Sequence, residues 1–360
     1  MKKILRFFNK KPLNWLLLAI PIVLIAELGH WPPIWIFALS AVSLIPLAGL
    51  IGESTESLAV YTGPKIGGLL NATLGNAAEL IITLVAINAG LLELVKASIT
   101  GSILGNLLLV MGAAILLGGL KNGLQVFDRR QAGNNAILLI LATVALVIPS
   151  LFSHSIGPET STEVEALSLG VAAVMIVLYV LGLIFILRST SSSTVSHQLH
   201  EGQHKAEMSL TAALVMLGLA TAGVVWMSET LVGVVESVTA TLGLSEFFLG
   251  IILIPIIGNV AEHLVAVTVA IRNKMDLSIE IAVSSSLQIA LFVAPLLVFV
   301  SLAMGHPLTL VFNQFELLAV IAAVLVAALV SSDGESNWLE GAALLAVYII
   351  LGIGFFLLPI

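Results

Sequence analysis

The chain has 360 residues, and its composition excludes a pair of soluble domains. Hydrophobic residues make up 59% of the chain and charged residues only 10%, whereas soluble domains contain about 45–50% and about 25% of these classes. So few charges cannot cover a water-exposed surface, so the sequence predicts an all-α polytopic membrane protein. It contains no cysteine, which excludes disulfides and thiolate metal sites.

Eleven apolar segments follow one another, and most have the roughly 20 residues needed to cross about 30 Å of hydrocarbon. They are residues 13–29, 33–60, 66–89, 91–119, 131–153, 164–188, 209–243, 246–271, 277–303, 308–330 and 338–358. The longest of them are expected to tilt, kink or extend past the membrane surface. The first resembles a signal peptide because basic residues precede it, but it lacks a small-residue cleavage site, so we expect it to be retained.

The basic residues predict how the spans are oriented. With the amino terminus in the cytoplasm, alternating loops place 13 of the 14 Lys and Arg residues on the cytoplasmic side, and only Lys96 on the other. This distribution follows the positive-inside rule. The sequence therefore predicts a cytoplasmic amino terminus and a carboxyl terminus on the opposite side. The short amino-terminal segment without a targeting peptide favours a prokaryotic plasma membrane.

One short motif occurs twice, 183 residues apart. Gly75-Asn76-Ala77-Ala78-Glu79 lies in the third segment, and Gly258-Asn259-Val260-Ala261-Glu262 lies in the eighth. Four further pairs match at the same offset: Gly67 with Gly250, Glu53 with Glu236, Ser102 with Ser285, and Leu104 with Leu287. An odd number of spans separates equivalent points, so two inverted repeats are expected, as in secondary transporters whose site lies near the midplane.

The repeat also predicts how the chain is organised. Residues 1–32 form a basic amino-terminal segment and an additional first span, and residues 33–188 form the first five-helix repeat. Residues 189–208 form a cytoplasmic linker loop, and residues 209–360 form the second five-helix repeat. The expected fold is thus one extra helix followed by two inverted five-helix repeats.

The glutamates of the repeated motif are expected near the middle of the bilayer. Glu79 lies about 13 residues from one end of its span, and Glu262 about 10 residues from Arg272 on a span that runs the other way. A charge at that depth costs at least about 2.5–3.5 kcal/mol, so each glutamate needs a cation or a proton. Calcium takes oxygen ligands, and two carboxylates match its charge. Because the same oxygens can hold protons, metal and protons would compete for them.

Other polar residues are candidates for the same site. Asn76 and Asn259 lie three residues before the glutamates on the same helix face, so their amide oxygens can ligate a cation or orient the carboxylates. Gly75 and Gly258 are predicted to interrupt their helices and to free backbone carbonyls. The spans that follow each motif supply a secondary polar lining, for which helix–helix hydrogen bonding is the equal alternative: Ser102, Asn106, Ser285 and Gln288.

Acids and histidines outside the motif have two interpretations each. Four acids near span ends are candidates for a gate or mouth that attracts cations, or are solvated interfacial groups: Glu53, Glu56, Glu229 and Glu236. His263 follows Glu262 on a different helix face and either relays protons or packs against a neighbouring helix. A linker cluster either senses pH or metal, or belongs to a solvated loop: His197, His200 and His204.

The sequence resembles the calcium/proton exchangers of the calcium/cation antiporter superfamily. The first repeat contributes Gly75-Asn76-Ala77-Ala78-Glu79-Leu80 and then Gly101-Ser102-Ile103-Leu104-Gly105-Asn106. The second contributes Gly258-Asn259-Val260-Ala261-Glu262-His263 and then Ser284-Ser285-Ser286-Leu287-Gln288-Ile289-Ala290. The resemblance covers the chain from about residue 40 onward and implies an eleven-helix fold that exchanges calcium for protons. In some relatives the loop between the halves is a long acidic stretch, whereas residues 189–208 contain only Glu201 and Glu207, which departs from acidic-loop regulation.

The expected function is therefore a secondary antiporter and not an enzyme. It exchanges Ca²⁺ for H⁺ by alternating access, and the alternative is a sodium/calcium or other divalent-cation exchanger of the same fold. There is no P-loop and no hydrolase motif, and a channel would need a filter usually built by oligomerisation. We expect no cofactor; the partners are small inorganic cations, which include the metal held by Glu79 and Glu262, and the lipid bilayer, without nucleic acid.

Overall fold

The computed structural model describes residues 12–189 and 208–358, and it is almost entirely helical. The chain forms two compact units. The first comprises residues 1–85 and 177–241, and the second comprises residues 86–176 and 242–360. Each unit contains segments of both expected repeats, so this division crosses the repeats and does not follow them.

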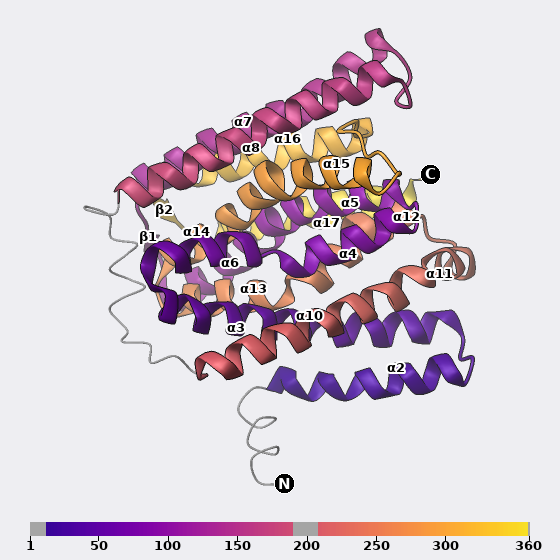
Figure 1. The fold of residues 1–360 in the computed structure, drawn as a ribbon. Helices are drawn as coiled ribbons and strands as arrows, with labels where there is room; N and C mark the ends of the chain where they lie inside the picture. The colour runs from indigo at the N-terminus through magenta and orange to yellow at the C-terminus, as the bar shows by residue number, and fades with distance from the viewer. Residues whose placement is uncertain (1–11, 190–207, 359–360) are drawn as a thin grey trace, which may run out of the picture. The chain divides into compact units, whose positions relative to one another are not determined.

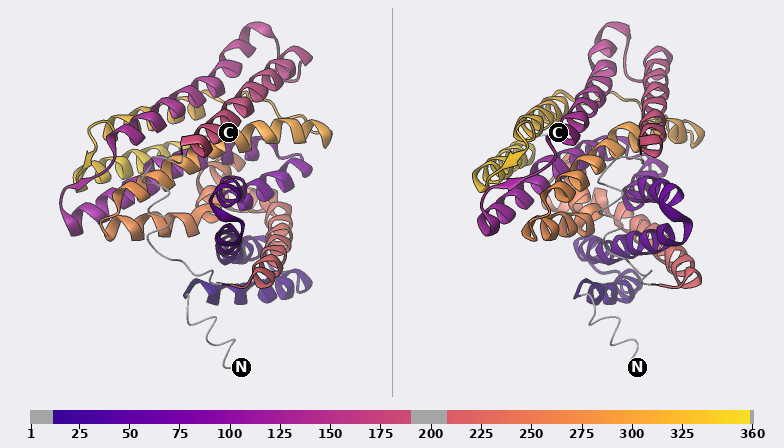
Figure 2. Two further views of the ribbon diagram at one scale, coloured as in Figure 1. Left: turned by 60° about the vertical axis from the view of Figure 1, so that its left-hand side comes forward. Right: turned by 90° about the vertical axis from the view of Figure 1, so that its left-hand side faces the viewer.

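The first unit is built around one long, bent helix. Its elements are η1 (Pro12–Leu18), α2 (Ala19–Leu28), α3 (Pro33–Leu74), the start of α4 (Ala77–Asn88), α10 (Leu210–Gly233), α11 (Val235–Leu242) and the end of α8 (Thr162–Ser189). Pro33 begins α3 because a helix does not need its missing N–H in the first turn. Gly63 has φ 79° and ψ 173°, so the helix bends there. The neighbouring helix α10 packs along α3 (Figures 1 and 2).

The second unit contains most of the remaining helices (Figure 1). They are α5 (Leu92–Leu104), η2 (Gly105–Val110), α6 (Met111–Asn122), α7 (Arg129–Ile156), α12 (Glu246–Phe248), η3 (Leu249–Leu253), α13 (Ile254–Ile271), α14 (Met275–Gln288), η4 (Ile289–Val293), α15 (Ala294–Ala303), α16 (Gln314–Val330) and α17 (Trp338–Leu357). The segments η2, η3 and η4 are π-helical. A small antiparallel sheet pairs β1 (Gln125–Val126) with β2 (Glu335–Ser336).

The core of the second unit lies where α6 packs against α13 and α17. Large apolar side chains of α5, η2 and α6 are fully buried there, among them Leu104, Leu107, Met111 and Ile115. By contrast, large apolar side chains of α7, α8 and α10 are exposed, as on helices that face lipid: Leu151, Val174, Phe185 and Leu219. The exposed surfaces of these three helices are therefore rich in apolar side chains.

Eight helices are long and apolar enough to cross a membrane in the described residues. They are 33–63, 92–122, 129–156, 162–185, 210–233, 246–271, 275–303 and 338–357, and three shorter apolar helices lie at 12–28, 77–88 and 314–330. Each expected segment overlaps one of these helices, but the expected third segment is divided between α3 and α4, and the expected seventh between α10 and α11. The prediction of an all-α polytopic membrane protein is confirmed.

Two backbone details recur at the offset of the repeated motif. The π-helical turns η2 and η4 occupy residues 105–110 and 289–293, and adding 183 to the first range gives 288–293. Gly90 and Asn273 are also 183 residues apart, and both have positive φ, of 80° and 60°. Each of these two residues ends a helix, because a left-handed residue redirects the chain and lets following N–H groups bond to the last carbonyls.

Candidate functional site

The first copy of the motif lies in the first unit, at a junction between two helices. Helix α3 ends at Leu74 and α4 begins at Ala77, so Gly75 and Asn76 stand between them. Glu79 lies in the first turn of α4, where free backbone N–H groups and the helix dipole favour a negative charge. Both Asn76 and Glu79 are only 3% exposed. The motif therefore places a buried carboxylate and a buried carboxamide at the start of a helix.

The second copy lies in the second unit, inside a continuous helix. Helix α13 runs from Ile254 to Ile271 without a break, so the interruption expected at Gly258 is wrong. A glycine in a helix costs only about 0.5–1 kcal/mol relative to alanine, which tertiary packing can offset. The irregular turn is η3, which precedes α13. Asn259 is 2% exposed, and its Nδ2 donates to the Pro255 carbonyl at 3.2 Å.

Three predicted site residues come together in the second unit. Asn106 of η2 donates from Nδ2 to Ser285 Oγ of α14 at 3.1 Å, and Ser285 is hydrogen-bonded to the carboxylate of Glu262 on α13. The other carboxylate oxygen of Glu262, Oε2, is buried and has no hydrogen-bond partner in the part of the chain that the structure describes. A buried carboxylate oxygen without a partner is unfavourable, so this position fits a cation or a proton.

The other candidates of the second unit lie close by in sequence. Ser102 on α5 is 1% exposed, and Gln288 donates from Nε2 to Ser284 Oγ of its own helix at 3.4 Å. His263 is partly buried, and its Nε2 is a buried atom without a hydrogen-bond partner among the described residues. No hydrogen bond among the described residues therefore fixes the Nε2 atom of this histidine, which follows Glu262 in the sequence.

The candidate mouth acids all belong to the first unit. Glu53 is partly buried, while Glu56, Glu229 and Glu236 are exposed. The linker histidines 197, 200 and 204 lie outside the described residues.

Sequence reasoning missed an ion-pair network around a buried lysine in the second unit. Lys96 of α5 is 3% exposed, and its Nζ lies 2.6 Å from Glu93 Oε1 and 2.9 Å from Glu159 Oε1. It also donates to the Val311 carbonyl at 3.1 Å, which occupies all three ammonium donors. Thr309 donates to the same oxygen of Glu159. The sequence offered one signal for this network: Lys96 is the single basic residue that the predicted topology places on the non-cytoplasmic side.

A buried acid of α16 contacts α5 one turn after Lys96. Thr100 of α5 donates to Glu316 Oε1 at 3.3 Å, and the Asn313 backbone N–H donates to Glu316 Oε2 at 2.8 Å. Asn313 and Glu316 form the capping box that begins α16, and Glu316 is 1% exposed. Its carboxylate therefore serves a helix terminus, and sequence alone did not distinguish this acid from a solvated one.

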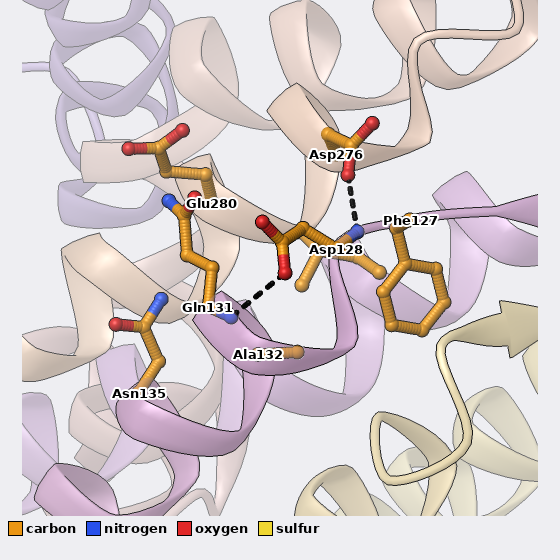
Figure 3. Close-up of a pocket in the computed structure, with 8 residues that line it drawn as sticks. Phe127, Asp128, Gln131, Ala132, Asn135, Asp276 and Glu280 are labelled. Atoms are coloured by element: carbon orange, nitrogen blue, oxygen red, sulfur yellow. Dashed lines mark hydrogen bonds between the residues drawn. The ribbon is translucent and has the colours of Figure 1, made fainter. Parts of the chain in front are cut away.

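A pocket at the start of α7 gathers several acids (Figure 3). Asp276 Oδ1 accepts from the Asp128 backbone N–H at 2.6 Å, and Asp128 Oδ1 caps α7 by accepting from the N–H groups of Arg130 and Gln131. Glu280 also lines the pocket. Asp128 thus caps α7 and Asp276 binds the Asp128 backbone, and within residues 12–189 and 208–358 no group of three or more His, Asp or Glu side chains is arranged to hold a metal ion.

Comparison with known proteins agrees with these features. The family model described as sodium/calcium exchanger protein matches residues 32–188 and 212–357. A Ca²⁺/H⁺ antiporter of Aphanothece halophytica is 47% identical over 361 residues, covering 96% of both chains. The Ca²⁺/H⁺ antiporter ChaA of Bacillus subtilis strain 168 is also 47% identical, over 94% of this chain and 97% of its own.

Solved structures show the same fold. The structure of native YfkE has a TM-score of 0.84 and 45% identity, and the match covers 96% of this chain and 100% of YfkE. The crystal structure of the H⁺/Ca²⁺ exchanger CAX has a TM-score of 0.72 over 96% of this chain and 92% of its own, at 16% identity, so it supports the fold alone. The candidate site thus sits in a fold shared with ion exchangers.

Proposed function

This chain belongs to the sodium/calcium exchanger family, and we propose that it is a secondary antiporter that exchanges Ca²⁺ for H⁺ across a membrane by alternating access. Two curated relatives named Ca²⁺/H⁺ antiporters are 47% identical over nearly its whole length. The observation that carries the proposal is the Glu262 carboxylate, which has one oxygen bonded to Ser285 and one buried oxygen without a hydrogen-bond partner among the described residues.

We assign the ion to Glu79 and Glu262 together. The support is the duplicated motif, the burial of Glu79 and the surroundings of Glu262. Two carboxylates neutralise one divalent cation, and Asn76 and Asn259 supply amide oxygens of the kind that calcium accepts. Ser285 and Asn106 orient the Glu262 carboxylate through their hydrogen bonds. Ser102 and Gln288 are secondary lining, and His263 is a candidate proton relay.

Exchange follows from competition for the same oxygens. A site with two negative charges changes its access from one side of the membrane to the other easily when calcium or protons cancel the charge. The empty site changes its access poorly, because two bare carboxylates would be desolvated together. Calcium moving one way must therefore be balanced by protons moving the other way. Protons on the far side drive calcium across, and no sodium is needed.

We also propose the membrane arrangement that the sequence predicts. It comprises eleven spans, one extra helix before two inverted five-helix repeats, with the amino terminus in the cytoplasm and the carboxyl terminus opposite. The support is the eight membrane-length helices with three shorter apolar ones, together with the π-helical turns and positive-φ residues that recur at an offset of 183. In this arrangement Lys96 lies at the non-cytoplasmic side.

Transport by the purified protein tests the proposal. Liposomes containing the protein and an acidic lumen are diluted into calcium at neutral pH without sodium, and calcium uptake is recorded. We expect uptake that a protonophore abolishes and that liposomes with Glu262→Gln do not show. A parallel set has equal pH on both sides and an outward sodium gradient. Uptake that follows the sodium gradient and ignores the proton gradient would replace the proposal with the sodium/calcium alternative.

A further inference from the structure

Two carboxamides cap the carboxyl-terminal end of the helix that carries Glu262. Asn122 Nδ2 donates to the carbonyls of Ala270 and Ile271, at 3.2 Å each. Gln125 Nε2 donates to the Ala270 carbonyl and to Asn273 Oδ1, at 3.0 Å each. The last four carbonyls of a helix have no partner within the helix, so these side chains complete the end of α13. The end of α13 is thereby tied to the segment that joins α6 to α7.

The cap is held in place by its own surroundings. Gln125 is 1% exposed, and its backbone pairs with Ser336 in the small sheet β1–β2. A Cβ at Gly118 of α6 would lie 2.2 Å from Gln125 Oε1 and 3.1 Å from the Ala270 carbonyl oxygen. The absence of a side chain at Gly118 therefore makes room for the Gln125 amide beside α13. The packing around Gln125 thus keeps its Nε2 donor next to the Ala270 carbonyl.

A third side chain holds the same helix from another direction. Ser278 of α14 is 1% exposed, and its Oγ donates to the Ala266 carbonyl at 2.8 Å. Ala266 lies one turn after Glu262 on α13. The same helix α14 carries Ser285, which is hydrogen-bonded to the Glu262 carboxylate. Helix α13 is thus fixed by side chains of two neighbouring segments between Glu262 and its carboxyl-terminal end.

The contacts that Asn122, Gln125 and Ser278 make with α13 have no equivalent at the matching positions of the repeat. At the offset of 183, Asn122 corresponds to Gly305, Gln125 to Leu308, and Ser278 to Val95. None of the three counterparts has a side chain that can donate a hydrogen bond. The helix that carries Glu79 therefore has no side-chain clamp of this kind at the equivalent positions.

We propose that Asn122, Gln125 and Ser278 are positioning residues that hold Glu262 in the geometry that binds calcium. The inference rests on the proposed function, in which Glu262 is a calcium ligand. Eight residues separate Glu262 from Ala270, about 12 Å along the helix, so the clamp acts on the ion through the helix and not by contact. Small displacements of a ligand weaken binding strongly, so the clamp sets calcium affinity.

The test compares variants that remove the donors with variants that keep them. Gln125→Leu removes the amide and Ser278→Ala removes the hydroxyl, whereas Ser278→Thr keeps a hydroxyl at the same place. Calcium/proton exchange is measured in liposomes over a range of calcium concentrations. We expect Gln125→Leu and Ser278→Ala each to raise the calcium KM about fivefold to tenfold, the loss expected for one or two hydrogen bonds. The maximal rate of these two variants should stay near that of the unmodified protein. Ser278→Thr should keep the unmodified KM.

Two controls separate positioning from general damage. Thr143→Val removes another buried hydroxyl, which bonds only to the Leu139 carbonyl of its own helix α7, and should leave the KM unchanged. Glu262→Gln should abolish exchange. If Glu262→Gln still transports, the proposed function fails. If Glu262→Gln is inactive but both Gln125→Leu and Ser278→Ala keep the unmodified KM, or Thr143→Val raises it equally, the positioning role is overturned. Ser278→Ala, the milder change, decides the matter if Gln125→Leu does not fold.

Discussion

The two copies of the Gly-Asn-x-x-Glu motif carry the same chemistry on different backbones. Around Glu79 the regular helix is interrupted at Gly75 and Asn76, and the glutamate lies in the first turn of the next helix. Around Glu262 the helix is continuous. The second copy is also clamped at its end by side chains whose counterparts in the first copy cannot donate. A repeated motif therefore fixes which atoms are available, while the residues outside it decide how firmly each copy is held.

Equivalent residues of the two copies therefore need not respond equally to mutation. Glu79 and Glu262 are both expected to be essential, because each supplies a charge that calcium requires. The polar neighbours are expected to be unequal, because their contacts are unequal.

The largest effect is expected for the two glutamates. Glu79→Gln and Glu262→Gln keep the shape of the side chain but remove both the charge and the titrating proton. Each variant should abolish exchange in liposomes while leaving folded protein in the membrane, as judged by a monodisperse profile in detergent. Near-normal calcium transport by one of them would remove that glutamate from the mechanism and break the equivalence of the pair.

A large effect on stability is expected at Lys96, whose counterpart at the repeat offset is Ile279. Lys96→Met leaves Glu93 and Glu159 without their cation. Breaking a buried pair costs about 3–5 kcal/mol, but these two acids are 63% and 42% exposed, so solvent screening reduces the expected loss to about 1–3 kcal/mol. The measurement is the thermal unfolding midpoint in detergent. Lys96→Arg should lose less, and an unchanged midpoint for Lys96→Met would show that the network is not stabilising.

A smaller effect is expected at the serine that contacts Glu262. Ser285→Ala removes the hydrogen bond to the carboxylate and leaves Asn106 Nδ2 without its acceptor. We expect the calcium KM to rise about fivefold, corresponding to about 1 kcal/mol. Ser102→Ala, the change at the repeat equivalent, is the matched comparison. A KM that stays at the unmodified value in Ser285→Ala would contradict the role of this contact.

The smallest effect is expected in the linker. Replacing His197, His200 and His204 together by alanine should leave maximal exchange intact, because these residues lie outside every expected span and cannot ligate an ion at the midplane. The rate of calcium uptake into liposomes, normalised to reconstituted protein, gives the answer. A complete loss in well-folded protein would show that the linker takes part in transport.

Much of this account could be predicted from the sequence, for physical reasons. The apolar segments indicated the helices because a membrane requires long uninterrupted hydrophobic stretches. The duplicated glutamates indicated the site because buried charges are rarely tolerated without function. The interruption predicted at Gly258 was wrong, since a glycine permits a break in a helix but does not force one.

Other features depend on contacts between distant parts of the chain. Nothing near Lys96 in sequence indicated Glu159 or the Val311 carbonyl, which approach only when loops far along the chain come together. The Gln125 cap could not be predicted either. In the sequence Gln125 is an ordinary polar residue of a loop, and its contact with Ala270 forms only when α6 packs against α13. Helix positions were thus accessible from composition and periodicity, whereas the supports of the site required the fold.

In the proposed mechanism calcium and protons share the oxygens of Glu79 and Glu262. This sharing can be measured by following the pH of a weakly buffered detergent solution of the protein while calcium is added. We predict that calcium binding releases protons from the unmodified protein and that a variant with both glutamates changed to glutamine releases none. Calcium binding without proton release, or release that persists in the double variant, would contradict the claim.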